Sequence, residues 1–383
     1  MSEPKSAEVD GLGEEHRLFR DHVRRFCQQQ IAPLVEEAEI TETFPAGLFP
    51  KLGAAGLLCP TFPERYGAAG ADTVTFCILA EELGRVCSGI AGSVIAHSSI
   101  GTSAILEYGT EAQRERWLPS AVRGESVFAF ALTEPNAGSD VKSVEARAAR
   151  TGDRYVIEGA KSFITNGGIC THALVAARTA PGDAGLSLFV VPSSAPGFVV
   201  DGKVKKLGNR SSDCVFLHLD GCQVSEDARI GAEGQGFQML MRSLGGGRMV
   251  VAARAVGLGE AALDAALSYA RERRQFGRRI ADFQAIQLKL ARMATRLRAA
   301  RLMVYDAART KDRGEDVTLP AAMAKLFATE TCNLVADDAL QIHGAYGYSR
   351  EFPVERYYRD ARLTTIVEGT SEIQHLIIAR ALI

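Results

Sequence analysis

Near its C-terminus the chain reads Ile366-Val367-Glu368-Gly369-Thr370-Ser371-Glu372-Ile373. A carboxylate, Glu368, stands directly before a Gly-Thr-Ser turn, and a helix-like apolar segment follows the turn. Apolar neighbours disfavour the ionised form of a carboxylate and move its pKa towards the range of a general base. Thr370 and Ser371 are helix N-cap types, and a helix N-terminus offers free N–H groups to an anion or phosphate. The run predicts a base beside part of a cofactor site, although Glu368 alone would more often be a dipole-balancing surface residue.

Composition limits the classes of function. The 383 residues are 46% hydrophobic and 23% charged, which is ordinary for a globular protein of two or three domains. A formal net charge of −2 provides no basic field for nucleic acid. The eight cysteines and seven histidines lack metal-ligand spacing, so we expect no metal site, no disulfide framework and a reducing, cytoplasmic location. No run looks long and apolar enough to span a membrane.

The chain divides into three zones that differ in their pattern of apolar and turn residues. Residues 1–126 are expected to form an N-terminal helical domain, and 234–383 a C-terminal helical domain. Between them, 127–233 alternates short β-rich runs with turn residues and predicts a β-sandwich or β-barrel domain. Strands are expected, for example, at 127–132, 155–157, 173–176, 186–191 and 215–219. The fold class is therefore α+β.

Three further motifs lie along these zones. In the segment Ala131–Asp140, a strand rich in aromatic residues ends at a hydroxyl residue, followed by a proline turn and Gly-Ser-Asp. Such a strand end either exposes polar groups around a planar ligand or is a plain turn. In Glu272–Gly277, Arg273 is either a solvated helix end or a clamp for pyrophosphate, because a guanidinium pairs well with phosphate oxygens. The small residues of Gln341–Tyr348 allow close approach of a ligand to the backbone.

In this order and spacing the motifs resemble the acyl-CoA dehydrogenase family, from about residue 12 to Ile383. The resemblance implies an N-terminal helical domain, a central β domain, a C-terminal four-helix-type bundle and FAD as cofactor. It implies that Glu368 is the catalytic base. The residues that it implies for FAD binding are Phe130, Leu132, Thr133, Ser139, Phe163, Ile164, Thr165, Arg273, Phe276, Gln284, Gln341, Gly344, Ala345, Thr370 and Glu372, with Arg273, Phe276 and Gln284 reaching across a subunit boundary. For substrate it implies Ser139, Arg248 and Gly369.

The chain departs from the family pattern at several positions. The family usually has Trp where Phe163 stands, a second Gly or Ser at Ala345, and Tyr at Val367. The residue three before Arg248 is usually a substrate-contacting Asp, but here it is Gly245. Some branches carry the catalytic Glu one or two residues before that Arg, and here both positions are glycine, which leaves Glu368 without a rival.

The activity implied is α,β-dehydrogenation of an acyl-CoA to the trans-2-enoyl thioester, with electrons passed to an electron-transfer flavoprotein. Two alternatives stay open: the same chemistry on an acyl group bound to a carrier protein, and an acyl-CoA oxidase-like activity. A flavin monooxygenase is disfavoured because such members commonly lack the base. The expected assembly is a homotetramer or homodimer. The small residues around 91–105 leave the length of the acyl chain open.

Overall fold

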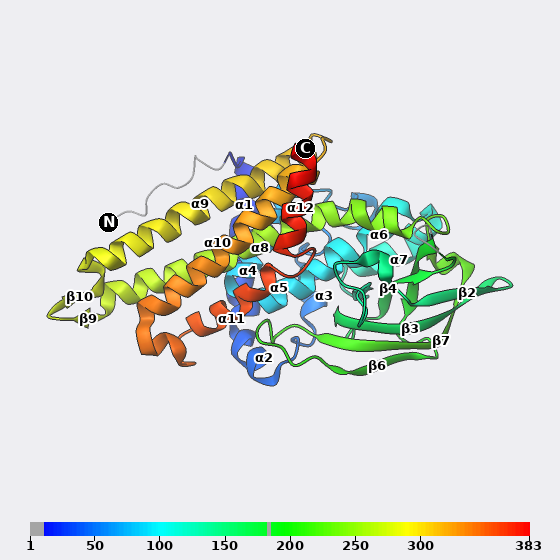
Figure 1. Ribbon diagram of the computed structural model, residues 1–383, viewed down its shortest axis with the longest axis horizontal. Helices are drawn as coiled ribbons and strands as arrows, with labels where there is room; N and C mark the ends of the chain where they lie inside the picture. Colours follow the sequence, from blue (N-terminus) through cyan, green and yellow to red (C-terminus); the bar gives the residue numbers. More distant parts are fainter. Residues whose placement is uncertain (1–10, 182–184) are drawn as a thin grey trace.

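The computed structural model describes residues 11–181 and 185–383. A bundle of long helices forms one half of the elongated molecule, and a twisted sheet with its covering helices forms the other (Figure 1). Helices, strands and helices follow one another along the chain, as the sequence predicts, so the α+β class is confirmed. The boundaries at 126 and 233 stay predictions.

The first part of the chain is helical. Its α-helices are α1 (Glu14–Phe26), α2 (Val35–Thr41), α3 (Leu48–Ala54), α4 (Thr73–Val86), α5 (Ser88–Ile95), α6 (Ser103–Tyr108) and α7 (Glu111–Val122), and the π-helical segment η4 (Ala96–Gly101) joins α5 to α6. Side chains fix the starts of two of them. Asp72 accepts the N–H of Thr75 at 2.8 Å to cap α4, and Thr110 forms a capping box with Gln113 at α7.

In the described part of the chain, one helical run, Ser88–Tyr108, is long and apolar enough to cross a membrane by length and composition alone. By this measure the expectation that no run is long enough is wrong. However, 78% of its most apolar window is buried inside the protein. A core helix has the same composition, since both environments exclude water.

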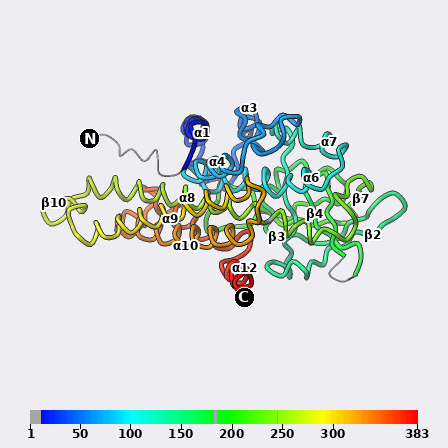
Figure 2. The backbone as a smooth tube through the Cα atoms, turned by 90° about the horizontal axis from the view of Figure 1, so that it is seen from above, coloured from blue at the N-terminus to red at the C-terminus, as the bar shows by residue number. Residues whose placement is uncertain are grey.

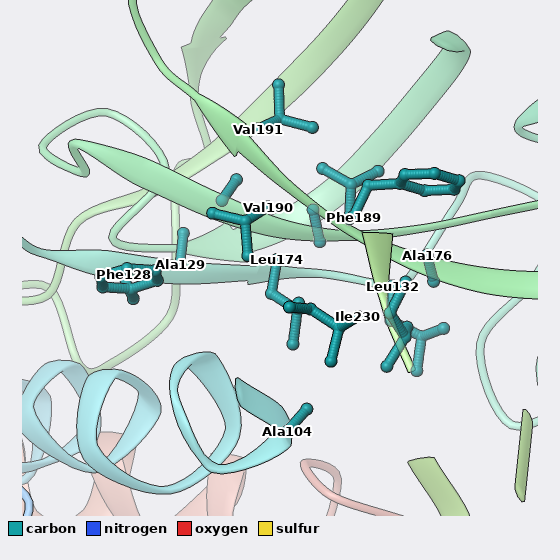
Figure 3. Packing of buried hydrophobic residues seen from close by; sticks show 14 of the residues in the cluster. Ala104, Phe128, Ala129, Leu132, Leu174, Ala176, Phe189, Val190, Val191 and Ile230 are labelled. Atoms are coloured by element: carbon teal, nitrogen blue, oxygen red, sulfur yellow. The ribbon is translucent and has the colours of Figure 1, made fainter. Parts of the chain in front are cut away.

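The sheet carries the strand order β6-β7-β3-β2-β4-β5-β8, and β1 pairs in parallel with β4. Its strands are β1 (Phe128–Ala131), β2 (Arg147–Thr151), β3 (Arg154–Thr165), β4 (His172–Arg178), β5 (Leu186–Pro192), β6 (Phe198–Lys203), β7 (Cys214–Ser225) and β8 (Arg229–Ile230). All five of these expected strands are present, whereas β2, β6 and β8 lie outside them. Side chains of β1, β4 and β5 pack together, and Ala104 of α6 points towards them (Figure 3).

The C-terminal helices are α8 (Gly236–Glu272), α9 (Gln284–Asp312), α10 (Thr318–His343), α11 (Val354–Thr364) and α12 (Ser371–Leu382). A small hairpin, β9 (Arg274–Gln275) and β10 (Arg278–Arg279), joins α8 to α9 at the tip of the bundle (Figure 2). A buried polar joint fastens α4 to α9: Glu81 accepts hydrogen bonds from Arg301 at 2.8 Å and from the Tyr305 hydroxyl at 2.7 Å. Helix α8 packs against both α4 and α10, so it lies between the N-terminal helices and the rest of the bundle.

Candidate active site

Glu368 lies in the turn between α11 and α12, in a left-handed backbone conformation with φ of +51°. Non-glycine residues rarely adopt this region, and they do so mostly where the surroundings impose it. Here the next carbonyl, that of Gly369, accepts hydrogen bonds from Lys325 Nζ at 2.8 Å and from Gln374 Nε2 at 2.9 Å. Thr370 caps α12 through the N–H of Ile373, as the sequence predicts. The turn that holds Glu368 is therefore fixed from α10 and from α12.

One oxygen of the Glu368 carboxylate is shielded from water, and the residue as a whole is half-buried. Its Oε2 is buried and has no hydrogen-bond partner among the described residues. Burial raises the pKa of Glu368 to about 7, although Arg254, Arg248 and Lys325 each act to lower it. The sequence predicted an elevated pKa from apolar neighbours. Desolvation is the larger cause, as predicted, but the three cationic side chains around the carboxylate were not expected.

Helix α8 makes room for this carboxylate. A methyl group at Gly247 would lie 2.1 Å from Glu368 Oε2 and 3.0 Å from its Cδ, so only glycine fits beside the carboxylate in its present place. Arg248, the next residue, is 8% exposed, and its Nε has no partner among the described residues. The glycine directly before Arg248 thus has a local reason: Glu368 fills the space that a side chain at position 247 would enter.

A second feature lies where β1 ends beside β3. The carbonyl of Thr133 accepts the N–H of Ser162 at 2.8 Å, which joins the two segments expected to face a flavin. The pairing of β3 with β7 shifts register between Lys161 and Ile164, and Phe163 inside this bulge has φ of +59°. The bulge turns the Phe163 ring outward, where it is 60% exposed and lies 5.7 Å from the Phe216 ring. A large aromatic face is thus presented at the sheet edge.

The expected cofactor residues fall into two separate groups. The sheet-edge group lies at the end of β1 and on the outer part of β3: Phe130, Leu132, Thr133, Ser139, Phe163, Ile164 and Thr165. Of these, Leu132 and Ile164 are buried, and Ser139 is exposed in the loop after β1. Thr370 and Glu372 begin α12, which lies between the sheet and the helical tip (Figure 1).

The bundle-tip group lies around the β9–β10 hairpin and the end of α10: Arg273, Phe276, Gln284, Gln341, Gly344 and Ala345. The guanidinium carbon of Arg273 lies 5.4 Å from the centre of the Tyr346 ring, and Phe276 is 92% exposed. Figures 1 and 2 place this tip in the half of the molecule away from the sheet. One copy of the chain therefore does not bring the two groups together.

The other acids near the motifs have structural partners. Glu134 is buried, pairs with Lys161 Nζ at 2.6 Å and accepts the N–H of Ala146 at 3.0 Å, so it shapes the turn after β1. Asp360 accepts the backbone N–H of Asn209, and burial raises its pKa to about 7. Asp360 also has one buried, unpartnered oxygen, Oδ2, but its other oxygen accepts the Asn209 N–H, whereas the Glu368 carboxylate lies against Gly247 of α8.

Sequence reasoning missed Lys325 and Arg254, which the fold brings to Glu368 from α10 and α8. A signal for both was present. Each is a lone cation inside a helical stretch of small and apolar residues, Ala321–Ala328 for Lys325 and Met249–Leu258 for Arg254. A charge in such a stretch needs a partner inside the protein or a bound ligand.

Comparison with known proteins agrees with this geometry. Family models of the acyl-CoA dehydrogenase N-terminal, middle and C-terminal domains match residues 13–125, 129–222 and 234–383. An acyl-CoA dehydrogenase of Bacillus subtilis (strain 168) is 44% identical, over 97% of this chain and 98% of the relative.

Solved structures agree as well. Butyryl-CoA dehydrogenase from Megasphaera elsdenii superposes with a TM-score of 0.94 at 37% identity, over 97% of this chain and 98% of that one. A chain in a structure described for the electron transferring flavoprotein of Acidaminococcus fermentans gives 0.95 at 39% identity, over 98% and 99%. The prolyl acyl carrier protein oxidase AnaB gives 0.91 at 34%, over 97% and 99%. The chain belongs to the acyl-CoA dehydrogenase family, whose members are oxidoreductases that act on acyl-CoA.

Proposed function

We propose that the protein dehydrogenates an acyl thioester between its α and β carbons, and that Glu368 abstracts the α-proton. The observation that carries this proposal is the state of the Glu368 carboxylate: its Oε2 is buried and unpartnered against Gly247 of α8, and its pKa is about 7. A general base works best when its pKa lies near the working pH. A carboxylate with a free oxygen in a water-poor site can accept a proton from carbon without first giving up a hydrogen bond.

The backbone beside the base has a second role in the proposal. Among the described residues the N–H of Glu368 donates to no acceptor, so it is available to the thioester oxygen. A hydrogen bond there stabilises the negative charge that develops on this oxygen as the α-proton leaves. Lys325 and Gln374, which hold the Gly369 carbonyl, would keep that N–H and the carboxylate in fixed relation. Arg248 and Gly369 are the proposed substrate contacts, with Ser139 at the CoA end.

The fit of FAD can be judged from the chain itself. The exposed Phe163 ring and the polar backbone of the sheet edge suit a planar isoalloxazine ring, and the N-terminus of α12 suits a phosphate. Arg273 and the backbone at Gly344, where the absence of a side chain permits a φ of +60°, suit a pyrophosphate and its adenosine. When bound, FAD supplies the acceptor for the β-hydrogen as hydride.

The two groups can hold one FAD only if they come from different copies of the chain. We therefore propose a homodimer or homotetramer in which the bundle tip of one protomer reaches the sheet edge of its partner. The exposed Phe276 and Tyr348 at that tip are apolar surface of the kind that an interface buries.

Acyl-CoA is the proposed substrate class, an electron-transfer flavoprotein the proposed electron acceptor, and the cytoplasm the proposed location. The alternative substrate is an acyl group on a carrier protein. It is favoured by the likeness to AnaB and by Gly245, which stands where the family usually has a substrate-contacting Asp and has open space beside it. Activity on matched CoA and carrier-protein thioesters separates the two, and reaction of the reduced enzyme with oxygen separates a dehydrogenase from an oxidase.

The proposal is tested with Glu368→Gln. The amide is close to the carboxylate in shape, so the fold and the bound FAD should persist, but it cannot accept the α-proton. The purified protein should be yellow and release FAD on denaturation. Anaerobic mixing of the variant with an acyl-CoA should bleach the flavin at least about 10⁴-fold more slowly than the wild type. Bleaching at the wild-type rate would assign the base to another residue, and a protein that stays colourless with added FAD would refute the flavin site.

A further inference from the structure

A buried arginine beside Glu368 has no role in the mechanism above. Arg254 lies in the middle of α8 and is 5% exposed, and its Nε and Nη2 are buried without a hydrogen-bond partner among the described residues. Within that part of the chain no carboxylate oxygen comes within 4.0 Å of it. Elsewhere the protein pairs such a group: Arg301 contacts Glu81 at 2.8 Å and Glu260 at 3.0 Å. A buried cation without a partner costs stability, so Arg254 needs another explanation.

The two unpartnered atoms indicate what Arg254 binds. Nε and Nη2 form one edge of the guanidinium, and a carboxylate binds this edge with both oxygens. The same protein shows the arrangement at Arg359, whose Nε and Nη2 donate to the two oxygens of Glu355 at 2.7 and 2.9 Å. In Arg254 the same edge is buried, and neither of its two nitrogens has a hydrogen-bond acceptor among the described residues. A carboxylate is the group that would accept hydrogen bonds from both nitrogens.

The internal carboxylates do not satisfy this edge. Glu368 and Asp360 attract Arg254 from a distance, but each has its pKa raised to about 7 by burial. Both are therefore only partly ionised near neutral pH, whereas an arginine stays charged. Arg248 and Lys325 add positive charge to the same region. The surroundings of Glu368 thus hold more positive than negative charge, and a ligand anion would restore the balance.

The place of Arg254 relates it to the acyl group. It lies seven residues after Gly247, hence two turns further on the same face of α8 as the glycine that touches the Glu368 carboxylate. Gly92 of α5 leaves space on the other side, since a methyl group there would lie 2.5 Å from Arg254 Nη1. Two turns correspond to roughly 10 Å along the axis, and helical side chains tilt back towards the N-terminus. A short acyl chain that starts at Glu368 and runs along α8 would end at the guanidinium.

We propose that Arg254 binds a carboxylate at the far end of the acyl group, so that the preferred substrate is the monothioester of a short dicarboxylic acid. This inference rests on the proposed dehydrogenase function and narrows its substrate class. Arg254 is the specificity-determining residue, and the glycine at position 92 gives its guanidinium the space it occupies.

The first test compares three matched pairs on the wild-type holoenzyme with a dye acceptor: succinyl- with butyryl-CoA, glutaryl- with pentanoyl-CoA, and adipyl- with hexanoyl-CoA. At least one diacid thioester should exceed its neutral partner about tenfold or more in kcat/KM, as expected for a desolvated charge pair. Preference for the neutral thioester in all three pairs would overturn the inference and leave the dehydrogenase function standing.

The second test uses Arg254→Met, with Arg242→Met as an exposed arginine control on the same helix. Arg254→Met should lower the diacid-to-neutral ratio of kcat/KM about 10²-fold, because only the diacid loses a buried charge partner. Loss of a cation that lowers the pKa of Glu368 affects both thioesters alike, so the ratio is read on the plateau above that pKa. An unchanged ratio of diacid to neutral thioester would overturn the inference.

The third test separates this inference from the function on which it rests. Calorimetric titration of glutaryl-CoA and pentanoyl-CoA into Glu368→Gln, with and without Arg254→Met, measures binding without turnover. Tighter binding of glutaryl-CoA that disappears with Arg254→Met supports the carboxylate site even if no thioester is oxidised. Equal binding of both thioesters in both variants overturns the site even if the wild type proves an active dehydrogenase.

Discussion

Replacing Gly247 by alanine separates the catalytic geometry from the stability of the fold. The new methyl group would lie 2.1 Å from Glu368 Oε2, whereas ordinary contacts of this kind begin at 3.4 Å. The carboxylate must therefore retreat by about 1 Å, and a displacement of that size costs roughly 10²-fold in rate when a catalytic group is involved. Glycine in a helix interior is less stable than alanine by about 0.5–1 kcal/mol. Gly247→Ala should thus lose activity without losing thermal stability.

The assay is the rate of flavin bleaching after anaerobic mixing with the best acyl thioester, read beside a thermal unfolding curve. Gly245→Ala is the matched control, because it makes the same change in the same helix and meets nothing within 4 Å. The family usually carries the larger Asp at that position, so alanine should be accepted. The control should keep the wild-type rate and share any gain in helix stability.

Two outcomes would refute this reasoning. If Gly247→Ala bleaches as fast as the wild type, the Glu368 carboxylate does not work from its place beside α8. If Gly245→Ala slows by the same factor as Gly247→Ala, the effect comes from the helix and not from contact with the carboxylate.

Three other predictions concern charged side chains, two of them at Glu368 and one at the bundle tip. The kcat/KM should rise with pH through about 7 and level off above it, since Glu368 must be ionised to take a proton and burial raises its pKa to about 7. Lys325→Met removes a cation that lowers this pKa, so it should move the rise to higher pH, and an unmoved profile would contradict this assignment. Arg273→Ala should weaken FAD retention about 10- to 100-fold, the worth of a charge-assisted hydrogen bond, and should reduce the oligomer mass. Its neighbour Arg274→Ala is the control, and unchanged FAD affinity with unchanged mass would exclude the proposed role.

The strands that the sequence predicted are those with their own apolar content. β5 and β7 are rich in valine, leucine and phenylalanine, β4 is an apolar run of alanine, leucine and valine, and each lies near its expected place. β2 is largely arginine and alanine, and β6 is mostly exposed and contains a glycine. Such segments have little intrinsic preference for a strand, and they become strands because β3 and β7 offer edges to pair with. Their existence depends on the tertiary structure, which local pattern does not contain.

The candidate site divides in the same way. Glu368 and the Thr370 cap are neighbours in sequence, so the motif alone could predict them together. Lys325, Arg248 and Arg254 reach Glu368 from two other helices, and their meeting depends on how α8 and α10 cross the C-terminal turn. The clash that makes Gly247 necessary is likewise a contact between distant parts of the chain. Neither the meeting of these cations at Glu368 nor the contact with Gly247 can be predicted from spacing along the sequence.

Several local rules of stability are broken around this one carboxylate. Glu368 has a left-handed backbone, Gly247 is a glycine in the interior of a long helix, and Arg254 is buried with two unpartnered nitrogens. Each of these costs about 0.5–3 kcal/mol on its own. At the α4–α9 joint, by contrast, Glu81 and Arg301 satisfy each other. Destabilising features of this kind persist together where the geometry they create serves function. Their convergence on Glu368 therefore supports this residue as the place where the chemistry occurs.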